Sequence, residues 1–155
     1  MYVETTIPNF YYDQRTDDAV VTRRRLTREW WGDAHERYEL LTGAPVLSEL
    51  LAGIGKRVSL RISLLSGLPL LLPDTAALNA MDVYVRNKLM PARRSEDALH
   101  LALASRYGCD FIVTWNCKHL ANPNKRRYLE RLNARSGLHV PIITTPADLL
   151  GRRTG

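Results

Sequence analysis

Cysteine and long hydrophobic runs are both scarce in this sequence. Its 155 residues include only two cysteines, Cys109 and Cys117, which do not form a Cys-x-x-Cys pair and are typical of reduced thiols in a cytoplasmic protein. The longest apolar run, Leu68 to Leu72, is interrupted by Pro69 and is far too short to cross a bilayer. The first residues carry neither the basic nor the apolar region of a signal peptide. We therefore expect a cytoplasmic protein that is neither secreted nor inserted into a membrane.

Repeats, low-complexity tracts and Pro/Gly/Ser linkers are also absent from the sequence. Apolar residue types make up 45% of the chain and charged types 25%, with a mean hydropathy of −0.24, which is ordinary for a folded globular domain and excludes disorder as the main state. We expect a single domain over residues 1–150, followed by a short C-terminal tail at 151–155.

The charge is unbalanced toward the basic side. Lys and Arg number 22 against 16 Asp and Glu, a net charge of +6, and the isoelectric point is about 9.6. A basic excess of this size favours a polyanionic partner, with nucleic acid first among the candidates.

Short β-prone segments alternate with longer segments of helical periodicity, the pattern of an α/β domain with a mostly parallel sheet. We predict strands at 2–5, 38–42, 68–72, 111–114 and 140–144, the third of them buried. We predict helices at 17–37, 45–52, 56–65, 74–89, 95–107 and 124–135, with a loop after the first strand and Gly32 as an interruption of the first helix.

Four polar residues fall at the same predicted edge of the sheet, where parallel strands end and the next helices begin. Glu4 closes the first strand, Glu49 lies early in the second helix, Asp97 lies in the first turn after Ser95, and Asn116 follows the strand at 111–114. Carboxylates this close repel one another unless a cation lies between them, and hard oxygen ligands suit Mg²⁺ or Mn²⁺.

Each of these residues also has an ordinary structural explanation. The helix dipole favours an acid at Asp97 in a first helical turn, Glu49 fits a solvated helix face, and Asn116 fits a turn. Glu4 is harder to explain in this way, because acids are depleted in strands.

Four segments resemble a known family in their order and spacing. They are Tyr2–Pro8 (YVETTIP), Leu47–Leu51 (LSELL), Glu96–Ala104 (EDALHLALA) and Asp110–Leu120 (DFIVTWNCKHL). Together they resemble the PIN-domain ribonucleases, whose bacterial members include the VapC-type toxins of toxin–antitoxin pairs. The resemblance extends from Tyr2 to about Leu150, and it implies a three-layer α/β/α fold with a mostly parallel central sheet of four to five strands.

The resemblance assigns roles to the residues at the sheet edge. It implies that Glu4, Glu49 and Asp97 are the first, second and third acids of a site for one or two Mg²⁺ or Mn²⁺ ions. Asn116 occupies the position of a fourth acid as a further ligand, and Thr6 occupies that of a nearby hydroxyl, for which we expect a role in orienting water or a phosphate oxygen. Two departures stand out: Glu4 replaces the usual aspartate, and Asn116 brings no charge.

The implied activity is metal-assisted hydrolysis of RNA, in the toxin half of a toxin–antitoxin pair with a cognate antitoxin and a homodimeric state. The alternative is a degenerate PIN-like module that binds RNA or protein without cleaving, which the departures at Glu4 and Asn116 favour. Another Mg²⁺-dependent phosphohydrolase is disfavoured by the absence of an Asp-x-Asp start.

Other features suggest contacts around the site. The pair Arg93-Arg94 lies closest to it among the basic clusters, and we expect these two arginines to bind RNA phosphates. His100 lies three residues after Asp97 on the same helical face, where a satisfied core histidine is favoured over a metal ligand. The pair Trp30-Trp31 fits either stacking on bases or helix packing.

Overall fold

The computed structural model describes residues 1–55, 57–116 and 123–153, and five short parallel strands lie at its centre. β1 (Tyr2–Val3), β4 (Phe111–Val113) and β5 (Ile142–Thr144) form a three-stranded sheet in the order β1-β4-β5, and β2 (Thr42–Gly43) pairs with β3 (Leu70–Leu71). A parallel bridge between Tyr2 and Leu41, with a hydrogen bond of 2.8 Å from the amide of Val3 to the carbonyl of Leu41, places β2 beside β1.

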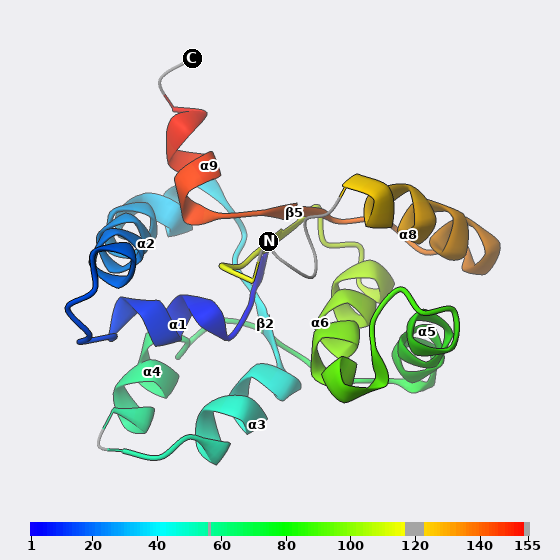
Figure 1. The fold of residues 1–155 in the computed structure, drawn as a ribbon, viewed down its shortest axis with the longest axis horizontal. Coiled ribbons are helices and arrows are strands. Elements are labelled where there is room, and N and C mark those ends of the chain that lie inside the picture. The colour runs from blue at the N-terminus through cyan, green and yellow to red at the C-terminus, as the bar shows by residue number, and fades with distance from the viewer. Residues whose placement is uncertain (56, 117–122, 154–155) are drawn as a thin grey trace.

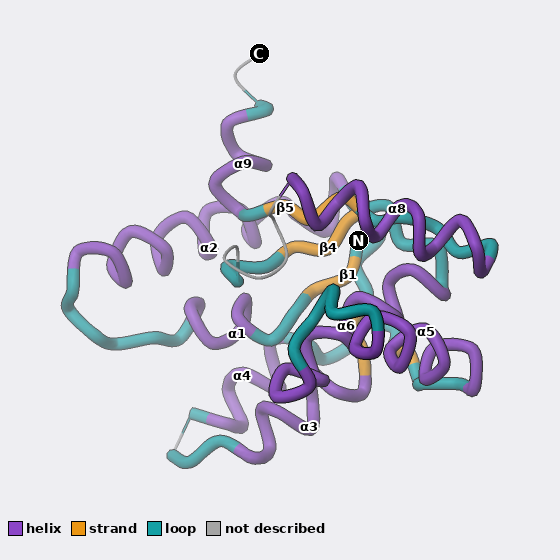
Figure 2. The backbone as a smooth tube through the Cα atoms, turned by 45° about the vertical axis from the view of Figure 1, so that its right-hand side comes forward, coloured by secondary structure: helices purple, strands orange, loops and turns teal. Residues whose placement is uncertain are grey.

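Helices cover the strands on both sides (Figures 1 and 2). One side carries α1, α2 and α9, and the other carries α5, α6 and α8, while α3 and α4 pack together at one end. The described helices are α1 (Thr6–Tyr11), α2 (Asp18–Arg37), α3 (Ala44–Ala52), α4 (Val58–Leu64), α5 (Thr75–Arg86), α6 (Ser95–Arg106), α8 (Pro123–Ser136) and α9 (Pro146–Gly151), with a 3₁₀ turn at Ala92–Arg94. The α/β class and the three-layer arrangement are therefore confirmed.

The core lies between the sheet and these two helical layers. Tyr2 and Ile112 on the strands, Trp30 on α2, Tyr84 on α5 and Leu101 on α6 are all buried. Apolar β-branched residues suit the short central strands, because both faces of a parallel sheet are covered by helices. The packing fixes the two ends of the sheet, and with them the edge where the polar residues gather.

Two helices were not expected from the sequence. Thr6–Tyr11 is helical rather than a loop, and Pro8 is tolerated there because the first N–H groups of a helix have no intrahelical acceptor. Pro146–Gly151 is also helical, and the side chain of Thr145 accepts a hydrogen bond from the amide of Asp148 to cap it. The expected break at Gly32 is wrong, since α2 continues through that position.

The strand predicted at 68–72 is real but shorter, and it is not buried. β3 comprises Leu70 and Leu71, and Leu70 and Leu72 are 42% and 60% exposed. β3 has β2 as its partner on one side, so it lies at an edge, where burial of alternate side chains is incomplete. Cys109 is a free, buried thiol, whereas Cys117 and the rest of the expected motif up to Leu120 lie outside the described residues.

None of the helices in the described ranges combines the length and the apolar character needed to span a membrane. Arg153 forms an ion pair with Asp33 of α2, so the described chain stays in contact with the domain up to that residue. The expected domain limits remain a prediction.

Candidate metal-binding active site

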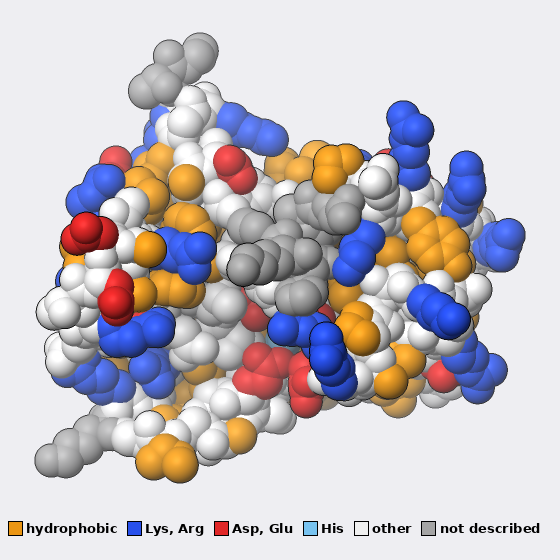
Figure 3. Space-filling view, viewed as in Figure 1, with side chains coloured by type: hydrophobic (Ala, Val, Ile, Leu, Met, Phe, Trp, Pro, Cys, Tyr) orange, Lys and Arg blue, Asp and Glu red, His pale blue; other side chains and the backbone are white. Residues whose placement is uncertain are grey.

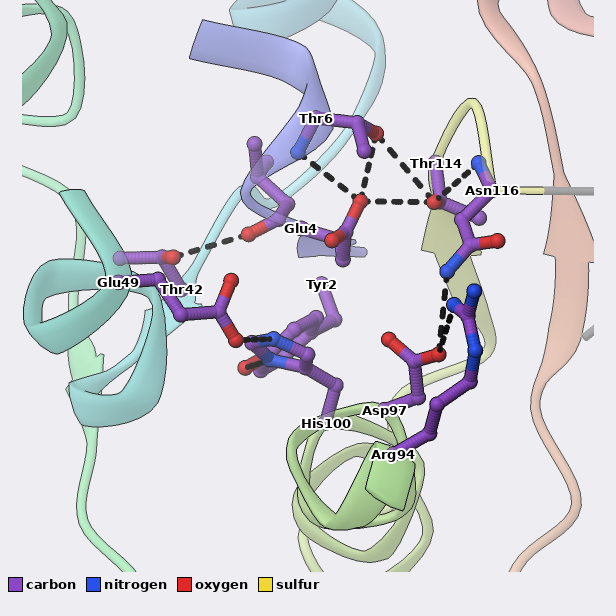
Figure 4. A network of polar contacts seen from close by, with 11 residues as sticks. Tyr2, Glu4, Thr6, Thr42, Glu49, Arg94, Asp97, His100, Thr114 and Asn116 are labelled. Atoms are coloured by element: carbon purple, nitrogen blue, oxygen red, sulfur yellow. Dashed lines mark hydrogen bonds and ion pairs between the residues drawn. The ribbon is translucent and has the colours of Figure 1, made fainter. Parts of the chain in front are cut away.

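The polar residues singled out from the sequence gather at one edge of the sheet (Figure 4). Glu4 follows β1 and Asn116 follows β4, and because these strands are parallel neighbours their carboxyl ends share that edge. Glu49 comes from α3 and Asp97 from the first turn of α6. The four residues from distant segments therefore lie around this one edge, and their role in a metal site remains a prediction.

Glu4 is held in place by hydroxyl and amide donors. Its Oε2 atom accepts hydrogen bonds from the amide of Thr6 (3.0 Å), the hydroxyl of Thr6 (2.6 Å) and the hydroxyl of Thr114 (2.7 Å). The other oxygen of Glu4 points into the space that Glu49 and Asp97 also face (Figure 4). Glu4 is only 4% exposed, so its carboxylate needs these donors, and a positively charged partner, to replace the water that it lacks.

Glu49 is held by a buried histidine. The Oε1 atom of Glu49 lies 2.6 Å from Nε2 of His100, whose Nδ1 lies 2.8 Å from the hydroxyl of Tyr2. His100 is 1% exposed, so both ring nitrogens of a buried side chain have partners. A Cβ on Gly43 would lie 2.5 Å from the Tyr2 hydroxyl, and glycine at this position leaves room for the tyrosine.

The contact between Glu49 and His100 shifts the pKa of both side chains. Burial alone would lower the pKa of His100, but the hydrogen bond to Glu49 and the charges of the surrounding carboxylates raise the pKa above its usual 6.5. Burial alone would raise the pKa of Glu49, but the hydrogen bond and charge of His100 lower the pKa below its usual 4.5. Both directions favour the ion pair.

Asp97 faces the same space from the opposite side and has a separate set of partners. Its Oδ2 atom accepts a hydrogen bond from Arg94 (3.2 Å) and another from the side-chain amide of Asn116 (3.2 Å). Asn116 thus donates to a carboxylate, with the nitrogen of its amide turned toward Asp97 (Figure 4). The uncharged residue at position 116 helps to hold the third acid.

The donor set fits a hard divalent cation. Among the described residues, ligand atoms of Glu4, Glu49 and His100 all lie within 4.8 Å of one another, and Asp97 is outside this group. Because both ring nitrogens of His100 have partners, the carboxylates are the groups that remain for a metal ion. The hydroxyl of Thr5 is buried beside this group, and its interaction with Glu49 contributes to lowering the pKa of that carboxyl. Carboxylate oxygens dominate the site, as Mg²⁺ and Mn²⁺ prefer.

The surface around the acids is basic. Figure 3 shows acidic side chains gathered near the middle of one face, with Lys and Arg side chains on both sides. Arg94 contacts Asp97 directly, while Arg93 is exposed beside it. Trp30 is fully buried, and Trp31 packs edge-on against Tyr11, so helix packing accounts for this pair.

Sequence reasoning gave too little weight to the residues that orient the acids. His100 contacts Glu49, Thr114 contacts Glu4, and Tyr2 contacts His100. His100 was predicted as a satisfied core histidine, and the other two only as strand residues. The signal for His100 was its spacing of three from Asp97, which places both on one face of α6. The partners of Tyr2 could not be found in this way, because its contact with His100 spans 98 residues of sequence.

A family model matches the larger part of the chain. Residues 19–121 match the model of the PIN domain, which is more than half of the chain. The chain belongs to the PIN domain family. The family implies a nuclease fold that typically binds a divalent metal and acts on RNA. Glu49, Asp97 and Asn116 fall within the matched PIN segment, whereas Glu4 and Thr6 precede it. No curated protein matches the chain.

Proposed function

We propose that this PIN domain is a Mg²⁺- or Mn²⁺-dependent ribonuclease. The observation that carries the proposal is the arrangement of Glu4, Glu49 and Asp97, which extend from β1, α3 and α6 toward one space. Three carboxylates facing one another at a sheet edge are unfavourable without a cation. A cation there would be held by these three acids, with the oxygen of Asn116 as a further ligand if its amide turns.

The protein residues around the acids keep the ligands in position. Thr6 and Thr114 fix Glu4, His100 fixes Glu49, and Asn116 with Arg94 fixes Asp97. When bound, the cation lowers the pKa of a water and stabilises negative charge on the scissile phosphate. The hydroxyl hydrogen of Thr6 is donated to Glu4, so we assign Thr6 to positioning this acid rather than to orienting water or phosphate.

Removing the metal or one of its acids tests the proposal. We expect cleavage of single-stranded RNA to stop in EDTA and to return with Mg²⁺ or Mn²⁺. Asp97→Asn should keep the fold but lower the rate by about two orders of magnitude or more, because a charge is lost from the shared site. The measurement is gel-resolved cleavage of labelled RNA by the two proteins purified in parallel. Equal rates in the two preparations would point to a contaminating nuclease and contradict the proposal.

We further propose that the enzyme is the toxin of a toxin–antitoxin pair and acts as a homodimer. The resemblance of its four sequence segments to VapC-type toxins supports this role, and the basic charge of +6 suits an RNA target. A small reading frame beside the gene, encoding a protein that binds this chain and blocks cleavage, would support the pairing. A monomeric mass by light scattering at micromolar concentration would contradict the dimer.

A module that binds RNA without cleaving is the second candidate. Asn116 supplies no charge at the fourth position, and Arg94 already neutralises Asp97 in the structure. Both features weaken the attraction of the site for a cation. RNA binding and RNA cleavage, each measured in Mn²⁺ and in EDTA, separate the two candidates. The binding module would bind RNA with equal affinity in both conditions and would release no cleavage products.

A further inference from the structure

An arginine lies over two aromatic rings beside the carboxylates. The guanidinium carbon of Arg23, on α2, is 5.3 Å from the ring centroid of Phe10 and 5.6 Å from that of Trp115. The two rings meet nearly edge to face, with centroids 6.1 Å apart. Phe10 and Trp115 are half-buried and Arg23 is exposed. We call these three residues the Arg23 platform.

The rings of the platform are fixed and are joined to the candidate active site. The indole N–H of Trp115 donates to the hydroxyl of Thr27 (2.8 Å), which sets the orientation of the ring. The backbone amide of Trp115 donates to the hydroxyl of Thr6 (2.8 Å), and that hydroxyl in turn donates to Glu4. Only one side-chain oxygen therefore separates the backbone of Trp115 from a proposed metal ligand.

Arg23 differs from its neighbours on α2 in having polar donors to spare. Arg24 donates to the carbonyl of Asp13, Arg25 pairs with Glu29, and Arg28 donates to the carbonyl of Tyr11. In the described part of the chain, the side chain of Arg23 has no ion-pair or hydrogen-bond partner among these contacts, and its interactions are those with the two rings. Its side chain is exposed.

We propose that the Arg23 platform binds one base of single-stranded RNA, next to the phosphate held at the carboxylates. This inference rests on the proposed ribonuclease function and specifies how its substrate is gripped. The planar guanidinium, which lies 5.3 Å and 5.6 Å from the two ring centroids, offers a flat cationic face on which a base stacks. Stacking of this kind accepts any base but requires that the base be unpaired, so the platform selects single strands over duplexes.

The test uses RNA that lacks one base at a chosen position. In the Asp97→Asn background, which prevents cleavage, we measure binding of single-stranded RNAs by fluorescence anisotropy, with an abasic nucleotide placed at each position in turn. We expect one position, beside the bond that the wild type cleaves, to lose about tenfold in affinity. Adding Arg23→Ala should reduce the loss at that position to about twofold or less while leaving the effect of other abasic positions unchanged.

Two further variants separate stacking from charge. Arg23→Lys keeps the charge but not the planar face, so it should behave as Arg23→Ala does in the abasic scan. Arg25→Ala removes an equivalent charge from the same helix at a side chain that is exposed and paired with Glu29, and it should leave the abasic penalty unchanged. Thermal melts check that every variant is folded.

The outcomes distinguish the platform from the function on which it rests. If RNA binds and is cleaved but Arg23→Ala leaves the abasic penalty intact, the platform is overturned and the ribonuclease stands. A uniform loss of affinity at all positions would mean that Arg23 contacts only phosphate, which also overturns base stacking. If no variant binds RNA and the wild type cleaves none, the proposed function fails and the platform fails with it.

Discussion

Each acid in the candidate site has its own local partner, and this limits the repulsion between carboxylates. Hydroxyl groups surround Glu4, a histidine pairs with Glu49, and an arginine with an amide holds Asp97. The partners come from the protein and remain when no cation is present. The carboxylate oxygens of Glu4, Glu49 and Asp97 that these partners do not contact face one another, where a cation could bind. The surrounding donors reduce the repulsion between the three carboxylates.

The ion pair between His100 and Glu49 makes metal-free stability depend on pH. The pKa of His100 is raised above 6.5, so its contribution is complete below that value and is lost as the pH rises through the folded pKa. The pKa of Glu49 is lowered below 4.5, so its contribution is present above that value and is lost as the pH falls through the folded pKa. Stabilisation by the pair is therefore greatest between pH 4.5 and 6.5.

Replacing the histidine should expose this dependence. His100→Ala leaves Glu49 partly buried without its partner, and we expect the free energy of unfolding to fall by about 3 kcal/mol in EDTA near pH 5.5. His100→Gln offers Glu49 a neutral donor and should be less destabilising. Thermal and urea melts in EDTA from pH 5 to pH 9 should show the difference between wild type and His100→Gln shrinking toward high pH. A difference that does not vary with pH would contradict a charged pair.

At the scale of elements, three helices are tied together by one buried amide. Asn133 on α8 accepts a hydrogen bond from the Tyr84 hydroxyl of α5 (2.6 Å) and donates to the Ser105 hydroxyl of α6 (3.1 Å) and to the carbonyl of His139 (2.7 Å). Asn133 is fully buried. This network joins α8 to the helix that carries Asp97, so the stability of the layer also supports the site.

Removing the amide should be costly. Asn133→Ala leaves the hydroxyl of Tyr84 and a backbone carbonyl without their partner, and we expect a loss of about 2–4 kcal/mol in the free energy of unfolding by urea. Tyr84→Phe should cost less, about 1 kcal/mol, because the bonds of Asn133 to Ser105 and to the carbonyl of His139 stay in place. The control is Asn87→Ala at the end of α5, where an exposed amide donates to the carbonyl of Val83; its effect should stay within about 0.5 kcal/mol. Equal losses for the two asparagines would contradict a role for the buried network.

The elements show which part of the fold could be predicted from sequence. The long helices α2, α5 and α6 were predicted to within about three residues at each end, because apolar periodicity over a dozen residues or more is a strong local signal. Four of the five strands lie within their predicted ranges, whereas β2 (Thr42–Gly43) meets the strand predicted at 38–42 only at Thr42. All five are only two or three residues long, and the exposure of β3 depends on its neighbours in the sheet. The helix at Thr6–Tyr11 was missed because Pro8 suggested a loop.

The candidate site could be predicted only in part, for a related reason. Topology alone brings the ends of parallel strands and the starts of the following helices to one edge, so Glu4, Glu49, Asp97 and Asn116 were expected together. The contacts that orient them are long-range: His100 meets Glu49 across 51 residues, and Thr114 meets Glu4 across 110 residues. No local pattern encodes which hydroxyl or ring nitrogen fills a given position, because this depends on packing in three dimensions.

At the scale of the whole molecule, the net charge is +6, and basic side chains lie on both sides of the acidic group (Figure 3). We expect RNA binding to weaken as the salt concentration rises. Arg93 and Arg94 lie in the 3₁₀ turn just before α6, next to Asp97. If both contact phosphates of a single strand, replacing both with alanine should reduce the slope of log K against log salt by about 1.4, since each contact contributes about 0.7. Arg94→Ala also frees Asp97, so cleavage is not a suitable readout, and binding is measured by anisotropy in the Asp97→Asn background from low to high salt.

The matched control is the double substitution Arg126→Ala and Arg127→Ala on α8, which removes the same charge from a helix on the outer right side of Figure 1. We expect this control to keep the slope of the parent. Equal reductions in both double variants would mean that the basic charge attracts RNA over the whole surface, and that Arg93 and Arg94 have no specific place in the path of the strand.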